Sequence, residues 1–213
     1  SRALTRSPNT IPAPAATTLE LIAPPATAAV GDTVNVNVKL SFAGLGIAGK
    51  IVSVAIGGAS KFGTTAADGS VTLAMPVAAV PGIYPITAAF IGDDSLLPAS
   101  ATSSFQLDKA AASLAGLAPA GVTLTGTLGG TKQALQQEAV SFAVTGPSGP
   151  TTIWVITDHL GNAPLPPPGL PAGDYVVTSA SFGGNANYAP TTVNFATSQQ
   201  FNVARIVQNI TFD

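Results

Sequence analysis

One pattern occurs twice in this chain, and its spacing limits what the chain can fold into. Residues 81–98 read PGIYPITAAFIGDDSLLP, and residues 171–190 read PAGDYVVTSASFGGNANYAP. Both copies begin with a Pro/Gly turn, continue through a tyrosine to an aromatic residue, and close with a Gly-led polar turn and a proline. The tyrosines, Tyr84 and Tyr175, are about 91 residues apart. Solenoid units span only about 20–50 residues, so a repeat of this length is a whole domain and the chain holds two copies of one module.

Alternating sequences predict that the module is built from β-strands. Residues 33–40, TVNVNVKL, place Val34, Val36, Val38 and Leu40 on one face and Asn or Lys on the other, which indicates a strand with one buried face. Turn signals recur about every 8–12 residues, a spacing typical of a β-sandwich. The other predicted strands are Thr18–Ile22, Lys50–Ile56, Ser70–Leu73, Ile83–Phe90, Ser103–Leu107, Val122–Thr127, Ala139–Val144, Ile153–Thr157, Tyr175–Phe182, Val193–Ala196 and Gln200–Val203.

The repeat divides the chain into five predicted segments. These are a Pro/Ala/Thr-rich arm or linker over residues 1–16, a first domain over 17–109, a short junction over 110–118, a second domain over 119–205, and a C-terminal strand over 206–213. The second copy of the motif also has one extra residue before its aromatic residue, which predicts a β-bulge.

The C-terminal segment is apolar and favours β structure, and such a strand is an aggregation hazard unless something pairs with it. It is either the opening strand of a further repeat or a strand that adds to the sheet edge of a neighbouring copy. The residues that would form this inter-subunit strand are Ile206, Val207, Ile210 and Phe212.

Composition excludes several classes of partner. Only 8% of the residues are charged, against about 25% in typical domains. The net charge is −2, and the eight Lys and Arg residues are scattered, so we expect binding neither to nucleic acid nor to an anionic membrane surface. The charge-free stretch 69–92 contains three prolines, so two strands are expected there, with no membrane insertion. Low charge favours burial against other copies of the chain.

The residues around the two tyrosines resemble a known family. The pattern Gly-x-Tyr-x-(Ile/Val) is similar to the F-strand of immunoglobulin folds, which implies that Tyr84 and Tyr175 form "tyrosine corners" and that Ile86 and Val177 take the core position of the usual cysteine. With IAGKIV at residues 47–52 and TAADGS at 65–70, the chain resembles the tandem Ig-like repeats of bacterial surface proteins and adhesins.

This resemblance implies an all-β chain of two tandem immunoglobulin-like β-sandwich domains. It also implies an extracellular or cell-surface location on a bacterium. The absence of cysteine fits that exterior, because no disulfide is needed there. The fold itself indicates little about the activity of the chain, since folds of this kind carry many functions.

Side chains suited to catalysis or metal binding are few. His159 is the only histidine and follows Asp158; a turn residue is favoured over a general base. Asp93 and Asp94 are weak candidates for calcium ligands, because no Asp-x-Asp-x-Asp-Gly loop surrounds them, and stabilisation of a turn by Asp is favoured. We therefore expect no catalytic residues, no metal and no cofactor.

Trp154 allows two interpretations. Its neighbours in the run TTIWVIT are apolar, so we expect it to be the core tryptophan of the second sandwich. The alternative is an exposed platform on which a sugar ring could stack. The core position is favoured.

These observations favour a non-enzymatic, extracellular structural module of a bacterial surface protein or filament, acting as a spacer or as a self-associating building block. Its expected partners are copies of itself or adjacent Ig-like repeats. The alternative is an adhesive or binding module that recognises a glycan or a protein through its loops. An enzyme is the least favoured class.

Overall fold

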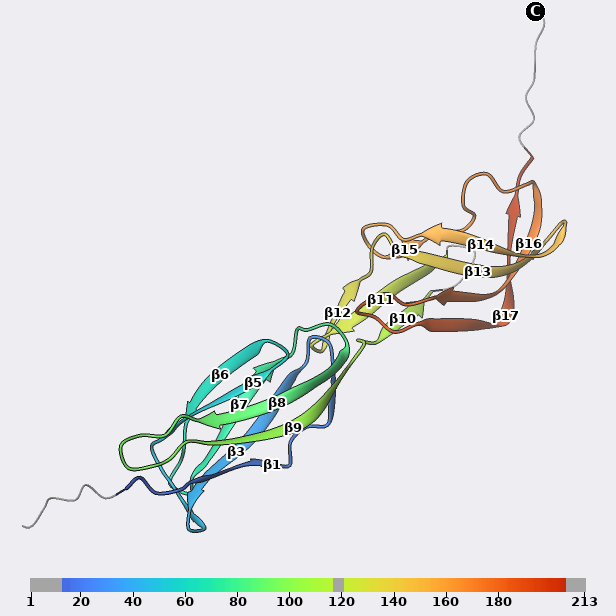
Figure 1. The fold of residues 1–213 in the computed structure, drawn as a ribbon. Coiled ribbons are helices and arrows are strands. Elements are labelled where there is room, and N and C mark those ends of the chain that lie inside the picture. The colour runs from blue at the N-terminus through green and yellow to red at the C-terminus, as the bar shows by residue number, and fades with distance from the viewer. Residues whose placement is uncertain (1–12, 117–120, 206–213) are drawn as a thin grey trace, which may run out of the picture. The chain divides into compact units, whose positions relative to one another are not determined.

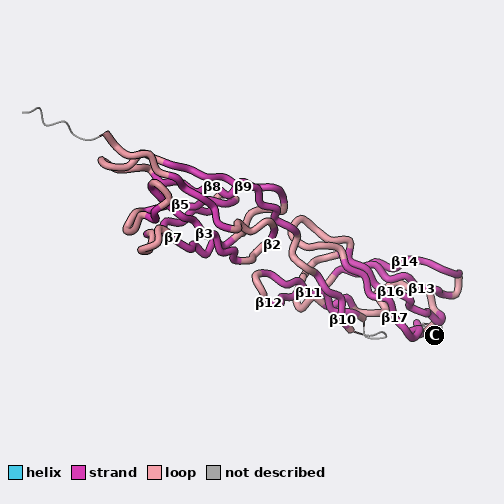
Figure 2. Tube along the Cα trace, turned by 90° about the horizontal axis from the view of Figure 1, so that it is seen from below, coloured by secondary structure: helices cyan, strands magenta, loops and turns pink. Residues whose placement is uncertain are grey.

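The computed structural model describes residues 13–116 and 121–205, and within these ranges it is all-β. Every described element is a strand or a loop (Figure 2). In the same ranges no helix has the length and apolar character needed to cross a bilayer. The candidate inter-subunit residues Ile206, Val207, Ile210 and Phe212 lie outside the described residues.

The chain divides into two compact units (Figure 1). Unit 1 comprises Ser1–Ala28 and Thr33–Leu107, and unit 2 comprises Ala29–Asp32 and Asp108–Asp213. The predicted junction 110–118 is wrong in its first part, because Ala112–Ala115 form a strand of unit 2 that is paired along its length. Leu114, inside this strand, is buried.

Unit 1 is built from two sheets whose strands pair antiparallel, except that β2 runs parallel to β9, where the N–H of Gln106 donates to the carbonyl of Ala26 and the N–H of Val30 to that of Asp108. A four-stranded sheet has β3 at its centre, paired with β1, β4 and β7. A five-stranded sheet has the order β2-β9-β8-β5-β6. The bounds are β1 Thr18–Ile22, β2 Thr27–Ala29, β3 Thr33–Phe42, β4 Leu45–Gly46, β5 Ile51–Ile56, β6 Ala59–Thr64, β7 Ser70–Pro76, β8 Gly82–Phe90 and β9 Ala99–Asp108.

Unit 2 repeats this plan with two four-stranded sheets. In one, β11 pairs with β10, β12 and β15; the other has the order β14-β13-β16-β17. The bounds are β10 Ala112–Ala115, β11 Val122–Leu128, β12 Thr131–Ala134, β13 Ala139–Gly146, β14 Gly149–Ile156, β15 Asn162–Ala163, β16 Gly173–Phe182 and β17 Thr191–Val203.

The hydrophobic core of each unit comes from alternating strand residues, as the sequence predicts. Along β3, Val34, Val36, Val38 and Leu40 are buried while the residues between them are more exposed. The predicted bulge is also confirmed, since consecutive residues Ala143 and Val144 of β13 pair with Ser179 and Val177 of β16, which leaves Thr178 as the extra residue. Complete burial of such side chains is the main favourable term in folding, about 1.5–3 kcal/mol for each large aliphatic group.

The main differences from the predicted strands are at β6 and β17; the short strands β2, β4, β10, β12 and β15 were not predicted either. Strand β6, over Ala59–Thr64, was not predicted because it is an edge strand with little burial, so its sequence lacks the apolar alternation that reveals a strand. The two segments predicted at 193–196 and 200–203 form one continuous strand, β17. Both differences lie at sheet edges, where pairing is decided by the rest of the fold.

Candidate functional site

Each unit has a buried threonine directly after an edge strand, Thr65 after β6 and Thr157 after β14. Its hydroxyl binds the backbone segment that precedes the neighbouring strand, β5 or β13, and we call this arrangement the threonine corner. In unit 1 the hydroxyl of Thr65 donates to the carbonyl of Ile47 at 2.7 Å and accepts the backbone N–H of Lys50 at 2.9 Å. The hydroxyl therefore satisfies two backbone groups that the sheet leaves unpaired. Thr65 is 4% exposed, so those groups have little access to water.

The equivalent corner of unit 2 has the same two hydroxyl contacts. The hydroxyl of Thr157 donates to the carbonyl of Leu135 at 2.7 Å and accepts the backbone N–H of Glu138 at 2.9 Å. Thr157 is 2% exposed. The two units therefore share a hydrogen-bonded framework in addition to an apolar pattern.

A polar turn closes the repeated motif in both units. In unit 1 one carboxylate oxygen of Asp93 accepts the backbone N–H groups of Ser95 and Leu96. In unit 2 the side-chain oxygen of Asn185 accepts the N–H groups of Asn187 and Tyr188. An Asx turn of this kind explains the choice of Asp or Asn at this position.

Each turn is tied to a neighbouring side chain. The other oxygen of Asp93 accepts a 2.6 Å hydrogen bond from the Lys50 ammonium, whereas Asn185 donates at 2.6 Å to the carboxylate of Glu138. The Lys50 contact, followed by the amide and hydroxyl of Ser95, holds the pKa of Asp93 well below its usual range. Asp94, the other calcium candidate, is exposed.

The turn that contains His159 is a second Asx-type turn. One oxygen of Asp158 accepts the backbone N–H groups of Leu160 and Asn162. The hydrogen bond from the backbone N–H of Asn162 is the main cause that lowers the pKa of Asp158. His159 itself is exposed. In the described part of the chain, no group of three or more His, Cys, Asp or Glu side chains is placed to hold a metal ion.

Both repeated tyrosines make the contact that defines a tyrosine corner. The hydroxyl of Tyr84 donates to the carbonyl of Val80 at 2.6 Å, and that of Tyr175 to the carbonyl of Pro171 at 3.0 Å. The surroundings differ, because Tyr84 is half-buried while Tyr175 is 3% exposed. Tyr175 also stacks on Phe201, with ring centroids 5.1 Å apart.

The core positions next to these tyrosines are filled by aliphatic side chains. Ile86 and Val177 are both fully buried. They lie on the inward face of β8 and β16, two residues after the tyrosine in each strand. Packing therefore takes the place of a disulfide at this position.

Trp154 does not lie in the core, and the sequence prediction is wrong at this residue. Its side chain is 65% exposed, while Ile153 and Val155 on either side are buried. Because successive strand residues point to opposite faces, Trp154 lies on the outer face of its sheet. Every residue from 153 to 156 is apolar, so the sequence alone could not decide which alternate residues point inward.

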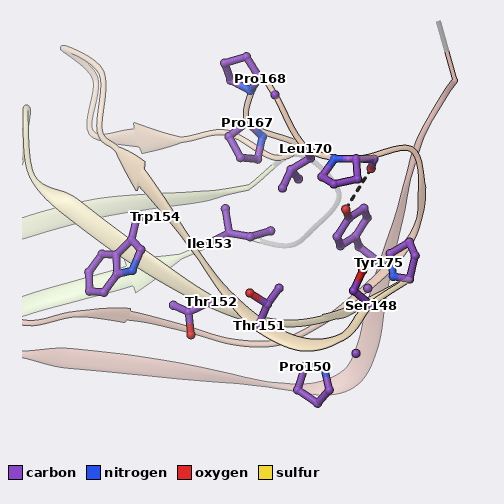
Figure 3. A pocket seen from close by; sticks show the side chains of 15 residues that line it. Ser148, Pro150, Thr151, Thr152, Ile153, Trp154, Pro167, Pro168, Leu170 and Tyr175 are labelled. Atoms are coloured by element: carbon purple, nitrogen blue, oxygen red, sulfur yellow. Dashed lines mark hydrogen bonds between the residues drawn. The ribbon is translucent and has the colours of Figure 1, made fainter.

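The exposed tryptophan borders a groove in unit 2 (Figure 3). One wall is β14 with the turn before it, and the other is the segment Pro167–Pro171, which we call the proline loop. The groove has a volume of about 510 Å³, and none of its 15 lining residues is charged. Tyr175 lies at the end opposite Trp154 (Figure 3).

Proline creates the open side of this groove. In unit 1 the corresponding segment is β7, which pairs with β3 over seven residues. In unit 2 only Asn162 and Ala163 pair with β11 before Pro164 and the run Pro166–Pro168. Each proline removes a backbone donor from the ladder, so the chain leaves the sheet and passes beside β14.

The same place in unit 1 is filled by side chains. A methyl group added at Gly63 of β6 would lie 2.7 Å from a methyl of Val71 and 2.8 Å from one of Leu73. The ammonium of Lys61 also donates to the carbonyl of Ala74 at 2.6 Å. Phe62 lies opposite Ser53 as Trp154 lies opposite Ser141, and it too is exposed. The aromatic position is therefore repeated, but the groove beside it is formed by the proline loop.

Comparison with known proteins gives no family assignment. No family model matches the sequence, and no curated protein sequence matches it. Among solved structures, the chain is similar to one from a 1.5-MDa bacterial ice-binding adhesin, with 14% identity and a TM-score of 0.34, over 89% of this chain and 64% of that one.

Two further structures show the same level of similarity. A Ca²⁺-stabilized adhesin of an Antarctic bacterium has 16% identity and a TM-score of 0.31, over 89% of this chain and 48% of that one. Bovine butyrophilin has 10% identity and a TM-score of 0.28, over 90% and 99%. TM-scores this low do not establish a shared fold, so neither the fold nor the function of this chain follows from them.

Proposed function

We propose that the chain is a non-enzymatic structural module of a bacterial surface protein, made of two tandem Ig-like sandwiches that act as a spacer or building block. The observation that carries the proposal is the repetition of one framework. Each unit has a buried threonine corner, an Asx turn and a tyrosine corner at matching places. These repeated features all stabilise the fold, and none of them requires a reactive group.

The polar side chains support a structural role. The carboxylates of Asp68, Asp93 and Asp158 each accept backbone N–H groups of their own turns. Asp93 is further neutralised by Lys50. Hydrogen bonds to the charged form keep a carboxylate ionised and weakly basic, which suits a turn better than proton transfer.

The surface supports association with other copies or with neighbouring repeats. Charged residues make up 8% of the chain. Large apolar side chains are exposed on the surface of both units, among them Ile51 and Phe62 of unit 1 and Trp154 and Ile156 of unit 2. A free surface normally carries more charge, so contact with like modules is the partner that this surface fits. We assign the C-terminal residues 206–213 to that contact.

The test is the mass of the full chain in solution, by size-exclusion chromatography with light scattering over a range of concentrations. A self-associating building block gives a mass that rises with concentration, and deletion of 206–213 lowers it to that of one chain. A full chain that remains monomeric throughout contradicts self-association and leaves the spacer role. Turnover of any substrate that depended on His159 would contradict the structural proposal itself.

A further inference from the structure

We propose that the groove between β14 and the proline loop of unit 2 binds a neutral glycan, with a sugar ring stacked on the indole of Trp154. This binding site goes beyond the structural role proposed above and does not depend on it. A surface module could carry the site whether or not it associates with other copies.

The first observation is an exposed aromatic platform. Trp154 is the only tryptophan in the chain, and 65% of its surface is open to solvent. The flanking residues on the same face, Thr152 and Ile156, are exposed as well. The face of an indole is the negative side of its quadrupole, and the C–H face of a pyranose ring is apolar with slightly positive hydrogens. The two faces therefore attract each other without a formal charge.

The second observation is the chemistry of the groove. It is apolar on the proline side, and on the β14 side it offers the exposed hydroxyls of Ser148 and Thr151, while the hydroxyl of Thr152 lies on the same outer face as the indole of Trp154 (Figure 3). No lining residue is charged, so nothing in the groove neutralises an anionic sugar or a charged peptide. An apolar wall with a few placed polar groups is the usual composition of a ligand site, and about 510 Å³ lies within the usual range of about 300–1,000 Å³.

The third observation concerns the backbone of β14, which is an edge strand among the described residues. The N–H of Thr157 donates to Glu138 on the β13 side. Alternation of the antiparallel ladder therefore directs the backbone groups of Thr152 and Trp154 outward. Their N–H and C=O groups can exchange hydrogen bonds with sugar hydroxyls at the rim of the stacked ring.

The same edge is poorly suited to an added β-strand. Pro150 is another residue of β14 whose backbone groups are directed away from β13, but proline has no N–H to donate. Proline on an edge strand is one of the ways in which proteins prevent strand pairing. The proline loop also lies along this side of β14, because both line the groove. A peptide strand or a second copy would lose ladder bonds at these places, whereas a sugar ring needs only the platform and the rim.

Rigid walls favour binding by a small ligand. Proline fixes φ near −65°, so Pro167, Pro168 and Pro171 lose little conformational entropy when a ligand contacts them. Tyr175 supports the loop from below, through its hydrogen bond to the carbonyl of Pro171. A site that is already ordered avoids part of the entropic cost of binding.

The experiment uses the intact chain, labelled and applied to an array of neutral and anionic glycans. The best neutral oligosaccharide is then titrated in solution while the emission of Trp154 is followed. We expect binding to neutral glycans, with a change in emission on saturation. Trp154→Ala should lower affinity by at least about tenfold, as for other aromatic residues that dominate binding, and Thr152→Val should lower it several-fold. Trp154→Phe should keep part of the affinity.

Unit 1 supplies the matched control, because Phe62 has the same place on its edge strand and no proline loop beside it. Phe62→Ala should leave glycan affinity unchanged. Since Trp154 is exposed, the far-UV circular dichroism of Trp154→Ala should equal that of the parent chain. The proposal is overturned if no neutral glycan binds, if only anionic glycans bind, or if binding survives Trp154→Ala. It is also overturned if an extended peptide binds at Trp154 and no glycan does.

Discussion

Units 1 and 2 have the same polar framework but differ in one segment, and the difference separates what maintains the fold from what provides a site. The buried threonine, the Asx turn and the tyrosine corner are present in both units. In unit 1 the segment after the corner is strand β7. In unit 2 that segment contains Pro166–Pro168 and forms the wall of a groove. A short run of prolines is therefore enough to convert a closed sandwich edge into an open one.

The shared corner predicts the largest effects. Thr65→Val and Thr157→Val keep the shape of the side chain and remove the hydroxyl, which leaves one buried N–H and one buried C=O without a partner. An unsatisfied buried group costs about 1–3 kcal/mol, so each variant should lose about 2–4 kcal/mol of stability. Denaturant unfolding measures the loss.

The serine variants at these two positions are the controls. Thr65→Ser and Thr157→Ser keep the hydroxyl and remove only one methyl group, worth about 0.8 kcal/mol. If valine and serine destabilise equally, the hydroxyl contacts do not hold the corner. If only one unit responds, the two corners are not equivalent.

The tyrosine corners should differ in strength. Tyr175→Phe removes a hydrogen bond from a side chain that is almost completely buried and should cost about 1 kcal/mol. Tyr84→Phe should cost less, because Tyr84 is half-buried and water can replace the lost partner at the Val80 carbonyl. Chemical denaturation of the two variants ranks them, and a larger loss for Tyr84→Phe would contradict the burial of the two rings.

One backbone position should respond with opposite signs in the two units. Gly49 has φ +73° and its counterpart Gln137 has φ +58°, and both precede a residue whose N–H is bonded to the buried threonine. A side chain in this left-handed region costs about 1–2 kcal/mol, partly offset by the greater freedom of unfolded glycine.

Gln137→Gly should therefore stabilise the chain by about 0.5–1 kcal/mol, and Gly49→Gln should destabilise it by a similar amount. The melting temperatures of the two variants provide the measurement. Gln137→Ala is the control, because it shortens the side chain without relieving the backbone and should leave the melting temperature nearly unchanged. Destabilisation by Gln137→Gly would show that the side chain makes a contact worth more than the strain.

The smallest expected effect is the pH dependence that Asp93 of unit 1 contributes. The pKa of Asp93 is lowered in the folded state by Lys50 and Ser95, so the ionised carboxylate stabilises the fold above the unfolded value of about 3.9. That contribution is lost as the pH falls below this value toward the folded pKa. Asp93→Asn, which introduces the residue type of unit 2, keeps the Asx turn and removes this titration.

The melting temperature of the parent chain should therefore exceed that of Asp93→Asn at pH 7, and the difference should shrink below about pH 4. The exposed position of the ion pair keeps the effect small. Added salt should reduce the difference at pH 7, because the pair is screened. A difference that is constant from pH 7 to pH 2 would show that the Asp93–Lys50 pair does not contribute.

The sequence predicts the parts of this fold that depend on local pattern. The alternation of Val34, Val36, Val38 and Leu40 predicts a half-buried strand, and the extra residue before Phe182 predicts the bulge that the structure has at Thr178. Each signal is complete within about ten residues, so no knowledge of the partner strand is needed.

The groove could not be predicted in this way. All four residues of the run Ile153–Ile156 are apolar, so alternation does not show which of them point inward. Only the pairing with β13 decides that Trp154 faces outward. The prolines at 166–168 predict a loop, but which strand the loop lies against depends on the tertiary fold. Strands β6, β12 and β15 were not predicted either, because their own sequences show little strand pattern and they form only by pairing with neighbouring strands of the fold.

The most direct test of this comparison is the environment of Trp154, because the chain has no other tryptophan. Fluorescence emission of the folded chain, with acrylamide quenching, is compared with that of N-acetyl-tryptophanamide and of the chain in denaturant. An indole on the wall of an open groove should emit near the wavelength of the free compound and be quenched at a rate approaching it. Blue-shifted emission that resists acrylamide until the chain unfolds would place Trp154 in the core and contradict the groove.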